Sequence, residues 1–400
     1  MTDPRHTLDV YLGKLHQVSC LLPALTARNG HVERRRLVAA VCRGDVATPR
    51  FESSPRKVPS DVYRLLDAAR KLAEGVPAGD LYLARLEELE LDLGMLEALG
   101  DPRRIRPLAA RRFGSGREEV PLGKGTAPVA ALARRILDEV AGSPEPRTLP
   151  ATSLPGEPSF GELIKRVARH AGLEVSVRVE ARLSAGAATG EKVVFIADRD
   201  FGTREVLRLA VHEVLGHLTS AANGRAQPMR LFEYGTAGSF GDQEGIALYL
   251  EEQAGVLDGY RLRTLAARVW MTERLHAGAT FQDSVRILAR DHGFAADDAV
   301  AVAERAYRGG GVARDVGYLR GWMRVRHAIA NEGATVDELR AGRVGLADLE
   351  TIRDLRPSGL ARVALYRPSL AYSLGPTDGG TSLLTSPPSF AASLTRLELT

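Results

Sequence analysis

The chain has 400 residues, of which 44% are apolar, and this composition excludes wholesale disorder because a large core can be buried. Its only cysteines, Cys20 and Cys42, exclude a disulfide scaffold and a cysteine-ligated zinc finger. The formal charge of +4, from 54 Lys plus Arg against 50 Asp plus Glu, is too small to indicate nucleic-acid binding without an accompanying motif. No apolar run approaches the roughly 18 to 20 residues of a membrane span, and the charged residues near the start of the chain lead us to expect no signal peptide. We therefore expect a cytoplasmic protein with neither a nucleic-acid nor a membrane partner.

Residues 1–145 are predicted to form a helical N-terminal region. Apolar residues fall at helical spacing in several stretches, among them Leu8, Leu12 and Leu15, and a further helix is expected after a cap at Ser60. A link rich in Pro, Ser and Gly at 144–158 predicts a domain boundary.

A small β-structure is expected after the link. Ser159 and Glu162 form a capping-box pattern at the start of a helix. Apolar and polar residues then alternate over 175–179, a turn is expected at Gly186–Gly190, and a second strand covers 193–196, so the two strands predict a hairpin.

The rest of the chain is predicted to be helical from Thr203, as the helix cap, almost to residue 355. The Ser-, Thr-, Gly- and Pro-rich tail at 370–400 lacks periodicity and is expected to be disordered.

One helix carries a metal-binding pattern. Residues 212–217 read His-Glu-Val-Leu-Gly-His, which is H-E-x-x-x-H, one residue longer than the H-E-x-x-H of zinc peptidases. On a regular α-helix, positions i and i+5 lie about 140° apart, so the imidazoles of His212 and His217 should diverge. Convergence requires the extra residue to be absorbed, for example by a π-bulge, and Gly216 tolerates such a distortion. The alternative is that both histidines are ordinary core residues.

Each residue of the motif has a chemical role if the imidazoles converge. Imidazole nitrogens suit Zn²⁺, and Glu213 would act as the general base on a metal-activated water. A third ligand is needed, and Glu244 in the first turn of the next helix is the candidate, although a lone acidic residue there can simply complement the helix dipole. Glu251 lies seven residues later on the same face, as a rival ligand or as a partner that orients a ligand imidazole.

The chain resembles the HExxxH "QEGLA motif" proteins, which include the microtubule-associated tyrosine carboxypeptidases and bacterial flavohaemoglobin-expression-modulating proteins. The resemblance covers roughly 155–355 and rests on four stretches in family order. They are His212–His217, the Asn-Gly-Arg-Ala-Gln-Pro run at 223–228, the Gln-Glu-Gly-Ile-Ala run at 243–247, and 307–321 with its Arg-Gly-Gly-Gly and Arg-Asp-Val-Gly-Tyr-Leu segments. Ile246, Arg314 and Gly317 depart from the family pattern.

The resemblance implies a predominantly helical α+β, gluzincin-like zinc metallopeptidase domain over 155–360, with its small sheet beside the HExxxH helix. It implies one zinc ion per chain, held by His212, His217 and Glu244, with Glu213 as the base. The implied reaction removes a C-terminal Tyr or Phe from a peptide or protein. The strand Val193–Ala197 is the candidate for pairing with the extended substrate.

Further site residues are candidates within the resembling stretch. Arg308 and Arg314 could hold the substrate's free carboxylate through paired hydrogen bonds, or be ordinary surface arginines. Tyr318 could donate its phenol to the oxyanion, or be an aromatic residue at the edge of the core. Gly309–Gly311 would let backbone approach a ligand, or form a mobile turn.

Two other functions stay open at this point. A regulatory or binding protein could keep the metallopeptidase fold and hydrolyse nothing, although a scaffold has no need of the base. A basic protein could instead dock on an acidic surface through its helical N-terminal half.

Overall fold

The computed structural model describes residues 3–154, 157–183, 185–370 and 397. They form a mostly helical α+β structure, as predicted, and contain two small sheets where the sequence predicted one. The chain divides into two compact units, a first unit of Met1–Val140 with Arg263–Arg320 and a second unit of Ala141–Leu262 with Gly321–Thr400. Residues 263–320, which the sequence assigns to the peptidase domain, thus group with the N-terminal helices.

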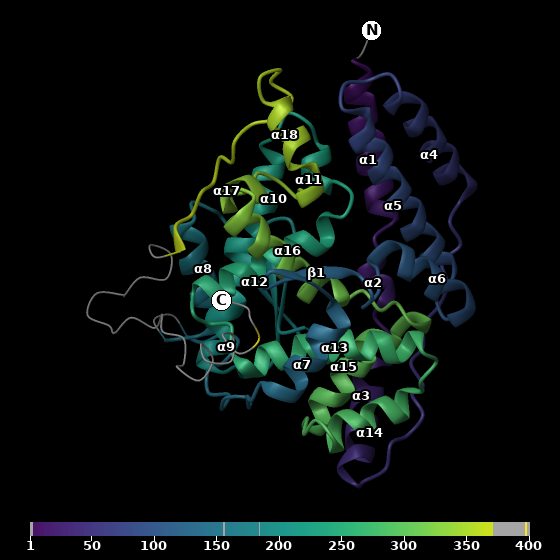
Figure 1. The fold of residues 1–400 in the computed structure, drawn as a ribbon, viewed down its shortest axis with the longest axis vertical. Helices are drawn as coiled ribbons and strands as arrows, with labels where there is room; N and C mark the ends of the chain where they lie inside the picture. Colours follow the sequence, from purple (N-terminus) through teal and green to yellow (C-terminus); the bar gives the residue numbers. More distant parts are fainter. Residues whose placement is uncertain (1–2, 155–156, 184, 371–396, 398–400) are drawn as a thin grey trace. The chain divides into compact units, whose positions relative to one another are not determined.

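The first unit is built from helices and one β-hairpin. Its elements are α1 (Pro4–Val18), α2 (Leu21–Leu25), α3 (Gly30–Cys42), α4 (Ser60–Ala73), α5 (Gly79–Glu97), α6 (Pro102–Phe113), β1 (Glu119–Leu122), β2 (Gly125–Pro128), α7 (Val129–Glu139), α14 (Phe281–Arg290), α15 (Ala296–Tyr307) and the 3₁₀ turn η2 (Arg308–Gly310). Helices α1, α4 and α5 pack side by side (Figure 1), and the predicted apolar residues Leu8, Leu12 and Leu15 are fully buried. The antiparallel β1–β2 hairpin was not predicted, and Ser60 begins α4 without capping it.

The second unit contains the other sheet and the motif helices. Its elements are α8 (Phe160–His170), β3 (Ser176–Glu180), β4 (Ala187–Thr189), β5 (Val193–Ala197), α9 (Thr203–Ala210), the π-helix η1 (Val211–Leu218), α10 (Thr219–Arg225), α11 (Leu231–Tyr234), α12 (Ser239–Gln253), α17 (Val336–Leu339), η3 (Leu346–Asp348) and α18 (Leu349–Leu355). Two more helices, α13 (Gly259–His276) and α16 (Val316–Asn331), contain the points where the chain passes between units.

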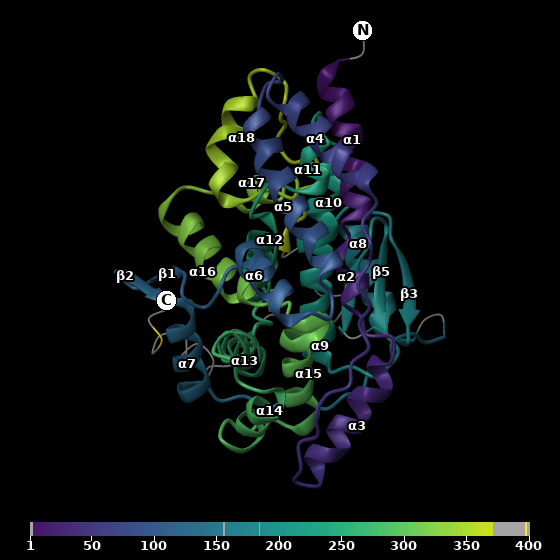
Figure 2. The same ribbon diagram turned by 90° about the vertical axis from the view of Figure 1, so that its right-hand side faces the viewer.

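The three-stranded sheet has the order β3-β5-β4, and the predicted hairpin is wrong. Strands β3 and β5 lie side by side in parallel register, with α8 packed beside them (Figure 2), whereas β4 pairs with β5 antiparallel. The segment predicted as a turn therefore contains a strand. Its three small residues carry no apolar alternation, and this is why the pattern did not indicate it. The middle strand β5 buries Val194 and Ile196 completely.

Local capping follows the predictions only in part. Ser159 caps α8 by accepting the backbone N–H of Glu162 at 3.3 Å, but the Glu162 carboxylate pairs with Lys165 and does not complete the box. Thr203 does not cap α9, because Gly202 precedes the helix and the carboxylate of Glu145 accepts the N–H groups of the first turn. The predicted link thus contributes a side chain to the second unit.

Two further predictions concern the C-terminal tail and membrane-spanning helices. The predicted tail at 370–400 lies outside the described residues, apart from residues 370 and 397. Of the helices in the described ranges, none combines the length and the apolar character that crossing a membrane requires.

Candidate metal centre

The H-E-x-x-x-H motif lies in a π-helical segment, as its spacing requires. Helix α9 runs into the π-helix Val211–Leu218 and then into α10 without a break, so the extra residue is absorbed inside one long helix. Two hydroxyls support the return to α-helical geometry. Thr219 Oγ1 donates to the carbonyl of Val214 at 2.8 Å, and Ser220 Oγ donates to that of Gly216 at 3.0 Å. The predicted distortion is confirmed.

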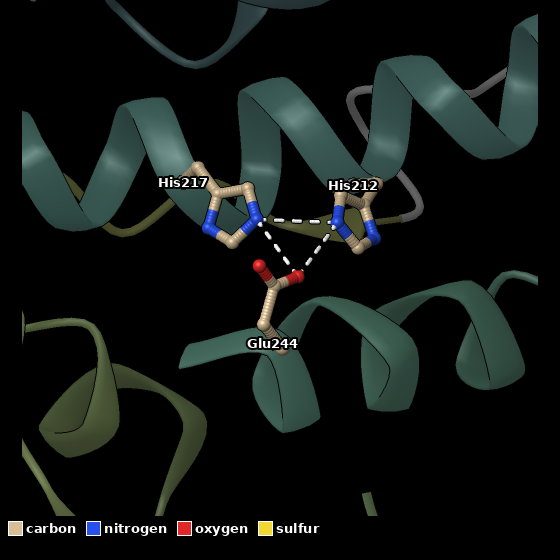
Figure 3. Close-up of side chains that lie close together, drawn as sticks. All are labelled: His212, His217 and Glu244. Carbon is tan, nitrogen blue, oxygen red and sulfur yellow. Dashed lines mark hydrogen bonds and ion pairs between the residues drawn. The ribbon is translucent and has the colours of Figure 1, made fainter. Parts of the chain in front are cut away.

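The π-helix brings the two imidazoles to one point. The Nε2 atoms of His212 and His217 lie 3.1 Å apart, and Oε2 of Glu244 lies 3.3 Å from the first and 3.4 Å from the second. Figure 3 shows both rings on the same face of their helix, turned toward the Glu244 carboxylate on the facing helix. Tetrahedral zinc with ligand distances of about 2.0 to 2.1 Å requires separations of about 3.3 Å between ligand atoms. The three donor atoms therefore have the spacing of a metal site.

Glu244 is placed by α12, and an orphaned oxygen marks the site. Helix α12 begins at Ser239, so Glu244 lies in its second turn and not at the helix start, which removes the helix-dipole explanation. Its Oε2 is buried and has no hydrogen-bond partner of acceptable geometry. A buried carboxylate oxygen without a donor is costly, and a cation between the three side chains would satisfy it.

Glu251 orients His212 from the other side of the ring. Its carboxylate, which is 0% exposed, lies 2.7 Å from Nδ1 of His212, and Arg261 and Arg208 approach it at 3.4 and 3.8 Å. Burial disfavours the charged carboxylate, but the two guanidinium groups and His212 outweigh it and lower the pKa of Glu251 to about 2. A carboxylate at Nδ1 fixes the tautomer that leaves the Nε2 lone pair toward Glu244. Of its two predicted roles, the position of Glu251 therefore suits a partner that orients the His212 ring and not a metal ligand.

The triad is charged in the absence of a metal. Burial opposes protonation of His212, yet the Glu244 carboxylate at 3.3 Å and the Glu251 carboxylate at 2.7 Å prevail and raise the pKa of His212 to about 9. Burial likewise opposes ionisation of Glu244, but His217 and His212 hold the pKa of Glu244 well below its ordinary value. A metal ion would replace the proton as the positive charge between these groups.

Glu213 points to the sheet and not into the triad. Its Oε2 accepts a hydrogen bond of 2.7 Å from the hydroxyl of Thr189, at the end of β4. The side chain is buried, so this hydroxyl fixes a carboxylate directly beside the candidate ligands. No pattern in the sequence indicated Thr189, because this residue lies in the segment that was predicted as a turn.

The Gln-Glu-Gly-Ile-Ala run combines a candidate ligand with packing residues. Gly245 lies so close to the backbone of Gly321 in α16 that a Cβ on Gly245 would overlap the Gly321 carbonyl group. Two residues later, Ala247 faces the π-helix, where a Cβ on Gly216 would come within 3.0 Å of its methyl group. Glu244 is therefore held between two close helix contacts.

Polar side chains near the candidate metal centre hold neighbouring segments in place by hydrogen bonds to their backbone. Gln243 donates to the carbonyls of Leu339 and Val344, both at 3.1 Å. Asn223 donates to Tyr366 O at 2.9 Å and accepts from Tyr366 N at 2.7 Å, and Gln227 makes the same two bonds to Arg362 at 2.9 and 2.8 Å. The amides of the Asn-Gly-Arg-Ala-Gln-Pro run thus have a structural role, holding residues 362–366.

The remaining candidates, Arg308, Arg314 and Tyr318, belong to the first unit. The Tyr318 ring is buried, with the guanidinium carbons of Arg268 and Arg305 at 5.5 and 6.0 Å from its centroid. Arg308 is buried in the turn that follows α15, and Arg314 is close enough to act on its charge. Their proposed substrate contacts stay predictions.

Comparison with known proteins identifies a family. A family model described as microtubule-associated tyrosine carboxypeptidase matches residues 43–376. A search of curated proteins finds no significant match. The matched range contains His212, Glu213, His217 and Glu244. It also contains the amides of Asn223 and Gln227 and the residues 362–366 to which they are hydrogen-bonded. Since the model covers most of the sequence, the chain belongs to the microtubule-associated tyrosine carboxypeptidase family.

Proposed function

We propose that this protein is a zinc carboxypeptidase that releases a C-terminal Tyr or Phe from peptides or proteins in the cytoplasm. The observation that carries the proposal is the convergence of His212, His217 and the orphaned Glu244 oxygen through a π-helix, with Glu213 fixed beside them. The family's description as a tyrosine carboxypeptidase supports the reaction and the aromatic preference.

The donor set fits zinc. Two imidazole nitrogens and one carboxylate oxygen suit Zn²⁺, whereas Mg²⁺ and Ca²⁺ prefer oxygen ligands alone. We propose one ion per chain, held by His212, His217 and Glu244. When bound, zinc polarises the scissile carbonyl and lowers the pKa of a water molecule toward about 7.

The proton transfers are assigned to Glu213. Its carboxylate takes a proton from the attacking water, whose oxygen bonds to the carbonyl carbon. As the peptide C–N bond breaks, Glu213 returns that proton to the nitrogen, and the C-terminal amino acid leaves as a free amine. The Thr189 hydroxyl, 2.7 Å from Oε2, holds the carboxylate in position for both transfers.

The strand proposed for substrate pairing changes from Val193–Ala197 to β4. Strand β5 is the middle strand of its sheet and already bonds to β3 and β4, so it has no free edge along that length. Strand β4 is an edge strand of this sheet, and it ends at Thr189, which contacts the base. An extended peptide that adds to β4 would pass Glu213, in the manner of a gluzincin domain.

Metal analysis combined with a peptide screen tests the proposal. We expect about one zinc per wild-type chain, lost in His217→Ala and kept in His170→Ala, which removes an exposed histidine of the same unit. Wild type should release Tyr or Phe from peptides with those C-termini, and Glu213→Gln should keep the metal but lose turnover. Full activity in Glu213→Gln would refute the mechanism. Folded, zinc-free wild type would favour the non-hydrolytic binding protein.

A further inference from the structure

Three consecutive backbone carbonyls of the π-helix each accept a hydrogen bond from a side chain. The pairs, with the distance from the oxygen to the donor atom, are Val214 with Thr219 at 2.8 Å, Leu215 with Arg340 at 3.0 Å, and Gly216 with Ser220 at 3.0 Å. Thr219 and Ser220 belong to the same continuous helix, whereas Arg340 follows α17. Leu215 lies between His212 and His217 in the sequence, so Arg340 contacts the helix between the two candidate ligands.

The Thr219 hydrogen bond is specific to the π-helical form. On a regular α-helix a threonine hydroxyl reaches the carbonyl three or four residues earlier, whereas Thr219 reaches Val214, five residues earlier. This reach matches the i to i+5 backbone hydrogen bonds of a π-helix. A side-chain donor within the segment therefore favours the widened turn over the regular one.

Arg340 is fixed within the second unit from several sides. Its backbone N–H donates to the carbonyl of Val336 at 3.0 Å, and its own carbonyl accepts from Nδ2 of Asn223 at 2.7 Å. In its side chain, Nη1 donates to the Leu215 carbonyl and Nη2 donates to Oδ1 of Asp337 at 2.9 Å. The Leu215 carbonyl is thus held at a set place relative to α17, and a change of the π-helix toward α-helical geometry would carry it away from Nη1.

An arginine is a costly residue at this position. Its side chain is 3% exposed, and burial lowers the pKa of the guanidinium below its ordinary value, although Asp337 acts in the opposite direction. The Asp337 side chain is itself 45% exposed, so water screens the one ion pair that Arg340 makes among the described residues. An apolar side chain would fill the same space at a smaller cost, but it would not donate to the Leu215 carbonyl. The guanidinium is therefore explained by the carbonyl to which it donates.

We propose that Arg340 is a positioning residue, which holds residues 211–218 in the π-helical form and so keeps the imidazoles of His212 and His217 directed at one point. Without its hydrogen bond the segment can relax toward an α-helix, on which positions i and i+5 lie about 140° apart. The consequence for zinc rests on the proposed function, whereas the support of the π-helix rests only on hydrogen bonds within the second unit.

The zinc affinity of the full chain, measured in competition with a chelator, tests the effect on the metal site. Arg340→Met should weaken zinc binding by about 10- to 100-fold, the range for losing a residue that supports a metal ligand from outside the coordination sphere. Arg340→Lys keeps the charge and a donor and should recover part of the loss. Arg353→Met, which breaks an ion pair with Glu338 of α17, is the control for lost stability and should bind zinc like wild type. An affinity within twofold of wild type in Arg340→Met, or an equal loss in Arg353→Met, would overturn the proposal.

Amide hydrogen exchange of the metal-free protein tests the helix itself. In Arg340→Met the peptides that cover 211–220 should exchange at least about fivefold faster, because the segment then moves between π- and α-helical forms, while those of α8 stay unchanged. Unchanged exchange over 211–220 would overturn the proposal. If wild type binds no zinc and Arg340→Met still shows the selective change, only the proposed function is refuted.

Thr219→Val tests the same support without removing a buried charge, and it decides the question if Arg340→Met does not fold. The change removes the hydroxyl that donates to Val214 and leaves the volume of the side chain nearly unchanged. It should weaken zinc binding by about 3- to 10-fold, the effect of losing one neutral hydrogen bond, and should speed exchange over 211–220. Zinc affinity and exchange equal to those of wild type would show that side-chain donors do not hold the π-helix, and would overturn the proposal.

Discussion

Replacing Thr189 by valine removes one hydroxyl from the end of β4 and leaves the volume of the side chain nearly unchanged. In the structure this hydroxyl donates a 2.7 Å hydrogen bond to Oε2 of Glu213, the proposed base. A hydrogen bond to a charged acceptor is worth about 1.5 to 3 kcal/mol. If that energy keeps the carboxylate in its productive rotamer, losing it should lower kcat by about 10- to 100-fold.

The assay is steady-state release of tyrosine from a peptide substrate, with zinc content measured on the same preparations. Because Thr189 is assigned to the base and not to the substrate, kcat should fall while KM and zinc content stay unchanged. Thr189→Ser keeps the hydroxyl and should recover most of the rate. Thr152→Val, an exposed threonine of the same unit, should behave like wild type. A kcat within twofold of wild type in Thr189→Val would refute the positioning role.

Three other changes have outcomes that the structure predicts. Gly245→Ala should destabilise the chain by about 1 to 3 kcal/mol in urea unfolding, because its methyl group would overlap the backbone of α16. Glu251→Gln should weaken zinc binding by about 10- to 100-fold in competition with a chelator, because the buried charge at the histidine Nδ1 is lost. The Arg353 guanidinium lowers the pKa of Glu338 to about 2 from an ordinary 4.5, so this pair stabilises the fold above about pH 4.5 and stops doing so as the pH falls toward 2. The contribution is at most about 3 kcal/mol, and about 1 to 2 after solvent screening, so the acid unfolding curve of Glu338→Gln should lack that loss.

The candidate metal centre could be predicted from the sequence because the spacing of its histidines is set by helix periodicity. Two histidines five residues apart converge only on a distorted helix, so the spacing made a π-bulge the condition for a metal site, and the structure has a π-helix over Val211–Leu218. Glu244 and Glu251 were found as one face of the next helix. Their separate positions relative to His212 could not be predicted, since they depend on how the two helices face each other.

Features that depend on tertiary contacts were not predicted. Strand β4 has only the residues Ala187–Thr189, too few for an alternating pattern, and it exists because β5 offers a partner. The grouping of residues 263–320 with the N-terminal helices likewise depends on tertiary contacts. Periodicity showed which residues of α15 are apolar, but not that Glu304 on this helix pairs with Arg34 of α3. A hydrophobic pattern identifies a buried face and not its partner.

The H-E-x-x-x-H motif and the Gln-Glu-Gly-Ile-Ala run pack against each other. Their residues therefore serve the contact between the two helices as well as supplying the candidate ligands. A shorter H-E-x-x-H would also bring two imidazoles together on a regular α-helix, but removing one residue turns every later side chain by about 100°. Asn223 and Gln227 would then leave the backbone groups of 362–366 that they bond to. Gly216 would lose its close contact with Ala247, and that contact sets the distance between the histidine helix and the helix of Glu244. The extra residue of the motif thus keeps the packing on both sides of the π-helix. This is a physical reason why the H-E-x-x-x-H spacing occurs in this chain together with Gly216 and with Ala247, three residues after Glu244.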